Sequence, residues 1–156
     1  MATFRKKLLW KHHHRKLPGL PETAKMIWDE LKTVQPFVLW LEGPVGSGKT
    51  SLVGVLLKCA GLPSHVPVTS PTFSYFNEYE IGDGRFFHCD FYRGGEKLKW
   101  EEIGITWPDR GGFFVEWPLE GHMQADLAPT HLLNILYNVD GSEDSRTYEF
   151  FKIEDY

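Results

Sequence analysis

The segment LEGPVGSGKTS, residues 41–51, carries the residue types and the spacing of a phosphate-binding loop. Gly43, Gly48, Lys49 and Thr50 satisfy the pattern G-x-x-x-x-G-K-[ST]. Glycines permit positive φ angles and let backbone N–H groups approach a ligand closely. The Lys49 ammonium would contact the β- and γ-phosphates of a nucleotide, and the Thr50 hydroxyl would be a ligand of Mg²⁺.

The residues on either side predict the strand and the helix that such a loop needs. Residues 36–42, PFVLWLE, form a continuous apolar run that is typical of a strand buried on both faces. Residues 49–60 predict a helix with Gly61 as its C-terminal cap, and its N-terminus would direct a positive dipole at the phosphates. The alternative is an ordinary turn between a strand and a helix. The predicted phosphate-binding residues are Gly43, Pro44, Val45, Gly46, Ser47, Gly48, Lys49, Thr50 and Ser51.

Two acidic residues follow apolar runs, as expected of side chains at the carboxyl ends of buried strands. Asp90 ends RFFHCD and Glu116 ends FFVE. In open α/β sheets this edge binds ligands, so we predict that a carboxylate at this edge joins Thr50 in holding Mg²⁺. One carboxylate would hold the metal ion and the other would position the attacking water. Lys49, Asp90 and Glu116 are therefore the candidate catalytic residues, although each acid alone is also typical of a solvated strand end.

Two further positions are candidates for contact with a nucleotide. Thr72 lies in SPTF, residues 70–73, where a threonine would sense the γ-phosphate as in a switch loop. Trp117 directly follows Glu116, and its ring suits packing or stacking on a base or a partner equally well. The sequence contains no Asn-Lys-x-Asp segment for reading guanine, which favours ATP over GTP.

The remaining pattern predicts one small α/β domain. Residues 21–34 read as a helix, because Ala24, Ile27, Trp28 and Leu31 recur at helical spacing. FNEYEI and RFFHCDF flank Gly-Asp-Gly as a β-hairpin, WEEIGI is a short helix and FFVEW is a short strand. Two strands, HLLNILYNVD and RTYEFFKI, surround the final turn. We therefore expect a three-layer α/β sandwich with a mostly parallel sheet, an antiparallel hairpin and an antiparallel edge.

Composition and charge constrain the class of protein. The 156 residues are 42% hydrophobic and 24% charged, which suits one globular domain, and no apolar stretch approaches a membrane span. Residues 1–16 hold six Lys or Arg and no acid, whereas the rest of the chain has 11 basic and 21 acidic residues. We expect residues 1–19 to be a disordered basic extension that is able to touch RNA or an acidic partner, and residues 20–156 to be the domain. Two cysteines without metal-ligand spacing favour a reducing, cytoplasmic location.

Several motifs in a fixed order resemble one family. After the loop come SPTFSYFNEY, FHCDFYR, EEIGI and VEWP, and together they are similar to the TsaE (YjeE) family, small bacterial ATPases required to make threonylcarbamoyladenosine in tRNA. The resemblance extends over about residues 20–153. It implies a P-loop α/β sandwich that binds ATP or ADP with Mg²⁺.

The resemblance also implies roles for particular residues. Asp90 and Glu116 would complete the metal site with Thr50, and Trp117 would be the tryptophan of the family's EW motif. Two weaker matches, Thr23 near the first helix and Arg146 near the final hairpin, would contact the nucleotide.

The resemblance implies two partner proteins. TsaE-like proteins bind TsaB and TsaD, and TsaD transfers the threonylcarbamoyl group to an adenosine beside the tRNA anticodon. ATP hydrolysis is thought to reset that complex between turnovers, so tRNA would be reached only through the complex. No arginine finger is evident beyond a guess at Arg93, so we expect hydrolysis to be weak without the partners. Two other functions stay open: a small-molecule kinase, and a binding module gated by nucleotide occupancy.

Overall fold

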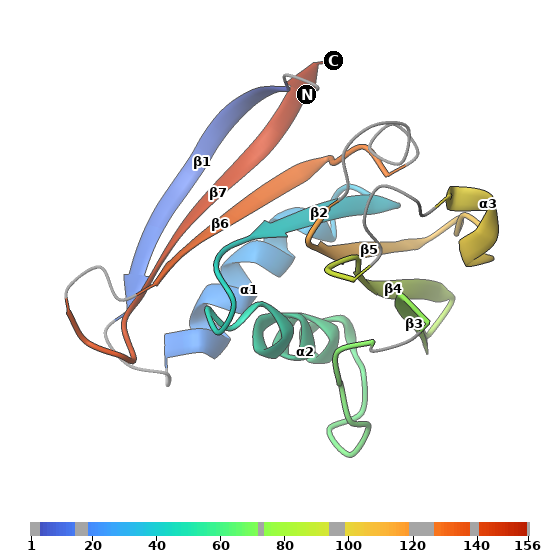
Figure 1. The fold of residues 1–156 in the computed structure, drawn as a ribbon, viewed down its shortest axis with the longest axis horizontal. Helices are drawn as coiled ribbons and strands as arrows, with labels where there is room; N and C mark the ends of the chain where they lie inside the picture. Colours follow the sequence, from blue (N-terminus) through green and yellow to red (C-terminus); the bar gives the residue numbers. More distant parts are fainter. Residues whose placement is uncertain are drawn as a thin grey trace.

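A single seven-stranded sheet organises the chain (Figure 1). The computed structural model describes residues 4–14, 19–71, 74–93, 99–118, 127–137 and 141–155. The elements in chain order are β1 (Arg5–His14), α1 (Leu20–Leu31), β2 (Phe37–Glu42), α2 (Lys49–Ala60), β3 (Phe76–Ile81), β4 (Gly84–Asp90), α3 (Trp100–Ile103), β5 (Gly111–Glu116), β6 (His131–Tyr137) and β7 (Arg146–Asp155).

The sheet has a parallel centre and antiparallel margins. Its strand order is β1-β7-β6-β2-β5-β4-β3. The neighbours β6, β2, β5 and β4 are parallel, whereas β3 pairs antiparallel with β4, and β7 pairs antiparallel with β6 and β1. The predicted parallel core, hairpin and antiparallel edge are confirmed.

The register of the parallel strands aligns their carboxyl ends. Leu41 of β2 lies opposite Glu116 of β5, and Asp90 of β4 lies opposite the same glutamate. Both acids therefore end their strands beside the end of β2, from which the loop at Gly43 departs. The expectation that Asp90 and Glu116 end neighbouring strands is confirmed.

The two faces of the sheet are covered differently. In Figure 1 both long helices, α1 and α2, lie on one face. Their apolar sides pack with alternate strand residues in a cluster that includes Ile27, Leu56 and Phe114. On the opposite face Phe113 belongs to a second buried cluster, against which Trp100 of the short α3 packs. None of the helices in the described part of the chain is both long enough and apolar enough to cross a membrane.

The helices follow the predicted pattern closely. The predicted face of α1 is buried or packed against the core, but the helix ends at Leu31 and not at residue 34. The chain then makes a tight turn before the strand, in which Val34 N–H donates to the Leu31 carbonyl (3.0 Å). The helix α2 has the predicted bounds, and Gly61 ends it with φ 116°, a value that suits glycine.

The basic N-terminal segment is not a disordered extension, so this expectation is wrong. Residues 5–14 form β1, which pairs along its whole length with β7 at the edge of the same sheet (Figure 1). Its basic residues interrupt an apolar group that includes Leu9 and Trp10, and both side chains pack against the helix-side core. The packing of these side chains and the backbone pairing order the segment despite its charge. Charge alone was therefore a misleading signal.

The packing of Trp10 leads to a stability prediction. Its ring centroid lies 5.1 Å from that of Phe150 on β7. Because the side chain is only partly buried, we expect Trp10→Ala to lower the free energy of unfolding by about 2 kcal/mol, below the range for fully buried aromatic residues. Leu8→Ala on the same strand is the control: Leu8 is 49% exposed, so its loss should change stability by no more than about 0.5 kcal/mol. Urea denaturation measures the free energy of unfolding of both variants. Equal losses in Trp10→Ala and Leu8→Ala would contradict the role of Trp10 in packing β1 against the core.

A buried histidine links β6 to α1. The His131 side chain is fully buried, stacks on Phe150, and has its Nε2 3.2 Å from the Glu30 carboxylate. Burial lowers the pKa of His131 from its ordinary value of 6.5, and the hydrogen bond to Glu30 opposes that shift. The unfolded chain therefore binds a proton at this position at higher pH than the folded chain does.

This difference in proton binding makes stability depend on pH. Stability from neutral His131 is fully present above pH 6.5 and is lost as the pH falls towards the lowered folded-state pKa. We expect the free energy of unfolding of the parent to fall faster below pH 6.5 than that of His131→Gln, by at most about 1.4 kcal/mol per pH unit. Denaturation at several pH values measures both slopes, and parallel slopes would contradict the assignment.

Candidate functional site

The loop between β2 and α2 has the backbone shape of an anion cradle. Gly46 and Gly48 have φ angles of 82° and 99°, and a Cβ built on either glycine would meet nothing within 4 Å. Open space therefore lies beside both residues. At Gly43 a Cβ would lie 2.7 Å from Ser47 Oγ, so that glycine is needed for the close approach of the loop to itself. The predicted loop is thus positioned at the N-terminus of α2, which favours anions.

Lys49 is buried at the start of α2 and contacts its own loop. Its Nζ donates to the carbonyl oxygens of Gly43 (2.6 Å) and Pro44 (3.0 Å) and lies 4.2 Å from the ring centroid of Trp117. Burial lowers the pKa of Lys49, and the charges of Glu116 and Asp90 oppose that change. The two predicted carboxylates and the predicted lysine therefore share one electrostatic site.

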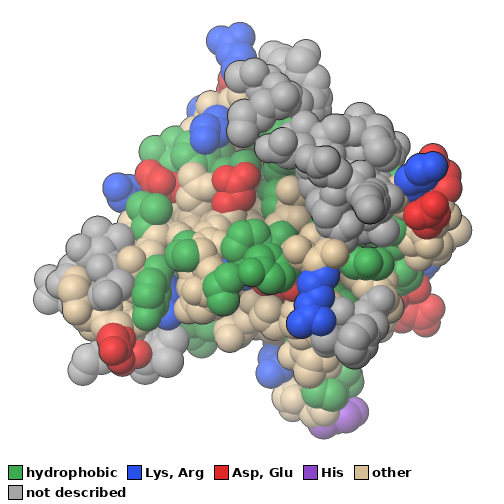
Figure 2. All heavy atoms as spheres, in the orientation of Figure 1, with side chains coloured by type: hydrophobic (Ala, Val, Ile, Leu, Met, Phe, Trp, Pro, Cys, Tyr) green, Lys and Arg blue, Asp and Glu red, His purple; other side chains and the backbone are tan. Residues whose placement is uncertain are grey.

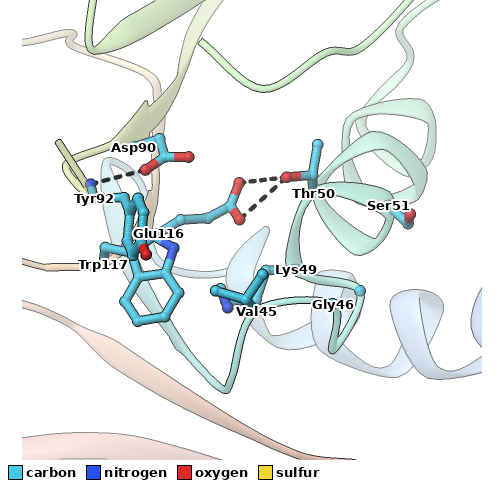
Figure 3. A pocket seen from close by; sticks show the side chains of 10 residues that line it. Val45, Gly46, Lys49, Thr50, Ser51, Asp90, Tyr92, Glu116 and Trp117 are labelled. Carbon is cyan, nitrogen blue, oxygen red and sulfur yellow. Dashed lines mark hydrogen bonds between the residues drawn. The ribbon is translucent and has the colours of Figure 1, made fainter. Parts of the chain in front are cut away.

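Glu116 is the most enclosed acid of the site, with a side chain that is almost fully buried. Thr50 Oγ1 donates to both of its carboxylate oxygens, at 3.2 and 3.0 Å (Figure 3). His88 Nε2 also contacts Oε2, and because a carboxylate only accepts hydrogen bonds, His88 is the donor. The Glu116 carboxylate, at the end of β5, therefore connects the first turn of α2 with β4.

Asp90 faces the same cavity from β4 and anchors the chain around it. Its Oδ1 accepts from the backbone N–H of Tyr92 (2.9 Å), and its Oδ2 accepts from the Ser70 hydroxyl (2.9 Å). Ser70 begins the SPTF segment, so the start of this segment reaches the site. Thr72, the predicted γ-phosphate sensor, lies outside the described residues.

These groups line a cavity of about 440 Å³. Aromatic side chains form part of its wall: Tyr92 and Trp117 have ring centroids 4.9 Å apart. Trp117 has φ 53°, an uncommon value for a residue other than glycine, which turns the chain sharply after Glu116. In the orientation of Figure 1, hydrophobic side chains gather near the middle of the visible face of the molecule (Figure 2). The residues that line the cavity are Val45, Gly46, Gly48, Lys49, Thr50, Ser51, Asp90, Tyr92, Glu116 and Trp117.

A second cavity of about 380 Å³ adjoins the first, and Tyr92 and Trp117 line both. Its other walls are mostly apolar and include Leu41 and Phe91, with the Glu42 side chain as its acidic group. Trp117 is therefore placed between the phosphate loop and an apolar hollow. The ring lines both cavities and belongs to neither of the two buried apolar clusters.

Other predicted residues lie further from this centre. Ser51 lines the cavity, but its side chain points away from Glu116 in Figure 3. Thr23 is fully buried on α1, where its hydroxyl donates to the Gly19 carbonyl (3.2 Å), and it does not line the cavity. Arg146 does not line the cavity either, and its Nε donates to the carbonyl oxygen of Ser47 in the loop (2.8 Å).

Two residues of the site were missed by the sequence analysis. His88 precedes Asp90 by two positions, and residues two apart on a strand share a face, so this spacing was the available signal. Tyr92 follows Asp90 by two positions, but it lies beyond the end of β4, where alternation gives no guide. Cys89, between His88 and Asp90, is buried, and burial raises the pKa of its thiol, which argues against a role as nucleophile.

The parallel strands, the glycine loop and the helix that follows it define a P-loop NTPase-like α/β protein. Comparison of the sequence with protein families identifies the same group more narrowly. Residues 18–148 match the profile of TsaE, described as threonylcarbamoyl adenosine biosynthesis protein TsaE. This match extends over most of the chain, and the chain belongs to the TsaE family.

Individual relatives agree with this assignment. The protein is 30% identical to tRNA threonylcarbamoyladenosine biosynthesis protein TsaE of Haemophilus influenzae over 77% of this chain and 73% of that protein. It is 35% identical to the protein of the same name from a Nostoc species, over 72% of this chain and 68% of the relative. A 39% identical match to the Aquifex aeolicus protein of that name covers 51% of this chain and 56% of the relative.

A solved structure shows the same fold. The chain superimposes on the crystal structure of Bacillus subtilis YdiB with a TM-score of 0.57, over 99% of this chain and 90% of that one. Sequence identity in this comparison is 24%, so the likeness concerns the fold alone. The superposition is nearly complete, whereas the family profile begins at residue 18, after β1.

Proposed function

We propose that this protein is a Mg²⁺-dependent ATPase that acts with TsaB and TsaD in forming the threonylcarbamoyl modification of adenosine beside the tRNA anticodon. The observation that carries the proposal is the convergence of Lys49, Thr50 and Glu116 in one cavity at the N-terminus of α2. Family membership supports the tRNA modification role. The loop and the acids support the nucleotide chemistry.

The residues present fit the phosphates of a nucleotide. Gly46 and Gly48 leave open space beside the loop, so backbone N–H groups can surround an oxyanion there. Lys49 is the one Lys or Arg among the described residues that line the cavity. Its present acceptors are two loop carbonyls, and a phosphate oxygen is a stronger acceptor than either. We expect Lys49 to exchange these contacts for the β- and γ-phosphates.

The donor set also fits Mg²⁺. Thr50 and Glu116 supply oxygen atoms within hydrogen-bond distance of each other, and Asp90 faces the same cavity. Among the described residues no group of three His, Cys, Asp or Glu side chains is arranged to hold a metal ion alone. Mg²⁺ commonly uses one or two carboxylates together with water and substrate phosphates, and the oxygen donors of this cavity match that habit. When bound, the ion would neutralise charge on the phosphate oxygens.

The two carboxylates suit different tasks in hydrolysis. Glu116 is buried and held by Thr50 and His88, so its position is rigid. Asp90 is held by Ser70 and by the backbone of Tyr92, at the side of the cavity near the SPTF segment. One of the two acids would orient the attacking water, and the other would hold the metal ion. Substitution of each acid separates the two assignments.

Among the described residues, no arginine that could stabilise the transition state lines this cavity. Arg93 lines a neighbouring cavity of about 240 Å³, which shares Asp90 and Tyr92 with the first cavity. Arginine fingers commonly raise nucleotide hydrolysis by several orders of magnitude, in some systems when supplied by a partner. We therefore propose that hydrolysis by the isolated chain is slow and that binding of TsaB and TsaD accelerates it, which would reset the complex between turnovers. In this scheme tRNA is reached through the complex, in the cytoplasm.

Binding of nucleotide should depend on Lys49. We expect Lys49→Ala to weaken ADP and ATP binding at least about tenfold, because the phosphates lose a charge-assisted contact. Titration calorimetry with Mg²⁺ measures the affinity. Lys58→Ala removes the same charge from the exposed last turn of the same helix and should bind like the parent. If Lys49→Ala also bound like the parent, the phosphate site would be wrongly placed.

Partner-dependent hydrolysis is the test of the whole proposal. The protein is captured with TsaB and TsaD of the same organism, with and without ATP, and phosphate release is measured on the same samples. We expect hydrolysis to rise at least about tenfold in the complex, because the partners complete the site. Equal turnover with and without the partners would count against this. Modification of tRNA supported by a non-hydrolysable ATP analogue would favour a nucleotide-gated binding module instead.

Glu116→Gln tests in the same assay whether the charge of this side chain is needed for hydrolysis. The change keeps the shape of the side chain but removes its charge, so it should bind ATP within about threefold of the parent while hydrolysis falls about a hundredfold or more. Asp90→Asn, tested beside it, shows which acid is needed for chemistry and which for the metal ion. Hydrolysis at the parental rate by Glu116→Gln would remove this residue from the assignment.

A further inference from the structure

Arg146 occupies a junction between three strands. It begins β7, where it pairs with Tyr137 of β6 and with His14 of β1. Its side chain is 9% exposed, and its guanidinium carbon lies 4.2 Å from the centroid of the Tyr137 ring. Nη1 donates to the carbonyl oxygens of Glu143 (2.7 Å) and Ser145 (2.9 Å). The guanidinium group is therefore held in one orientation by its own hairpin.

The remaining contact of this group reaches the phosphate loop. Arg146 Nε donates to the carbonyl oxygen of Ser47, 99 residues earlier in the chain, at 2.8 Å. The Ser47 N–H donates to the Pro44 carbonyl at 3.1 Å, and Ser47 is almost fully buried. Both backbone groups of Ser47 thus have partners, one within the loop and one on β7.

The geometry of the peptide bond between Ser47 and Gly48 links the direction of the Ser47 carbonyl to that of the Gly48 N–H. Among the described residues the only cis peptide bond is Gln35-Pro36, so the bond between Ser47 and Gly48 is trans. In a trans peptide the carbonyl oxygen and the following N–H point in opposite directions in one plane. If the Ser47 oxygen points to Arg146, the Gly48 N–H points away from it. Gly48 lines the cavity that Arg146 does not line.

We infer that Arg146 is a positioning residue, which fixes the Ser47–Gly48 peptide so that the Gly48 N–H faces the bound phosphate. This inference rests on the proposed nucleotide site. It differs from a direct contact between Arg146 and the nucleotide, because Arg146 acts through the loop backbone and from outside the cavity. The β6–β7 hairpin then belongs to the phosphate site, although none of its described residues lines the cavity.

The arrangement needs an arginine and not merely a positive charge. Three carbonyl oxygens accept from one planar side chain: that of Ser47 from Nε, and those of Glu143 and Ser145 from Nη1. A lysine ammonium has three donors on a flexible stem and lacks the planar fork. Arg146→Lys therefore retains the positive charge while it removes the planar guanidinium group. No ion pair joins Arg146 to a carboxylate in the described part of the chain.

The test compares two ligands that share phosphates but differ in the nucleoside. Binding of ADP and of inorganic pyrophosphate, each with Mg²⁺, is measured by titration calorimetry for the parent, Arg146→Lys and Arg146→Ala. We expect both variants to lose about tenfold in affinity for both ligands, the size of one lost hydrogen bond to a charged group. Thermal denaturation of each variant confirms that the folded protein is being titrated.

The outcomes separate the possible roles of Arg146. Weaker binding of ADP with unchanged binding of pyrophosphate would overturn the inference, because it would indicate contact with the base or the ribose. Parental affinity of Arg146→Lys for both ligands would also overturn it, because charge alone would then suffice. If the parent bound neither ligand, the proposed nucleotide site itself would fail, and this inference with it.

Chemical rescue adds a measurement that a general loss of structure does not mimic. Arg146→Ala leaves a space of the shape of the missing group, so millimolar methylguanidinium should restore much of the lost pyrophosphate affinity. Arg85→Ala is the control: Arg85 binds Glu78 (2.6 Å) and Thr106 (3.0 Å) at the surface of the sheet. It should bind pyrophosphate like the parent and show no response to methylguanidinium. Absence of rescue in Arg146→Ala, with the variant folded, would contradict positioning by the guanidinium group.

Discussion

The buried carboxylate of Glu116 is the group on which the arrangement of this protein depends. A charge removed from water is stable only where donors surround it, and here Thr50 and His88 supply them from two different elements. These contacts require β4, β5 and the start of α2 to meet at one edge of the sheet. The parallel order of β2, β5 and β4 meets this requirement, because it places the ends of the three strands side by side. The core packing on both faces in turn keeps that order.

The same edge determines where a phosphate loop can lie. β2 is buried along nearly its whole length, so the chain leaves the sheet only after Glu42 and turns at Gly43 into the loop. The loop then has partners on both sides. Lys49 joins it to Trp117 after β5, and Arg146 joins it to the β6–β7 hairpin. The site is thus held by strands on both sides of β2.

The antiparallel margin of the sheet also contacts the loop. β1 covers β7 along its length and contributes Trp10 to the packing against Phe150. β7 carries Arg146 at the end nearest the loop. The basic segment β1 therefore packs against β7, and β7 carries the arginine that contacts the loop. The family profile begins at residue 18, after this segment, whereas the sheet of this chain includes the segment as β1.

Local sequence pattern was enough to predict much of this protein. The spacing of glycines, Lys49 and Thr50 predicted the loop, and apolar runs that end in Asp90 and Glu116 predicted the strand ends, because these features depend only on neighbouring residues. The order of the motifs along the chain indicated the family. Hairpin and helix positions followed from turn residues and from periodicity.

Contacts between residues far apart in the chain were decided only by the tertiary structure. The strand at residues 5–14 forms because β7 offers an edge, while its charge taken alone indicated disorder. His88 entered the site because two parallel strands bring it to Glu116, and Arg146 reached Ser47 across 99 residues. Residue type and spacing encode what a segment can form by itself, whereas the partner of a buried polar group depends on which strands become neighbours.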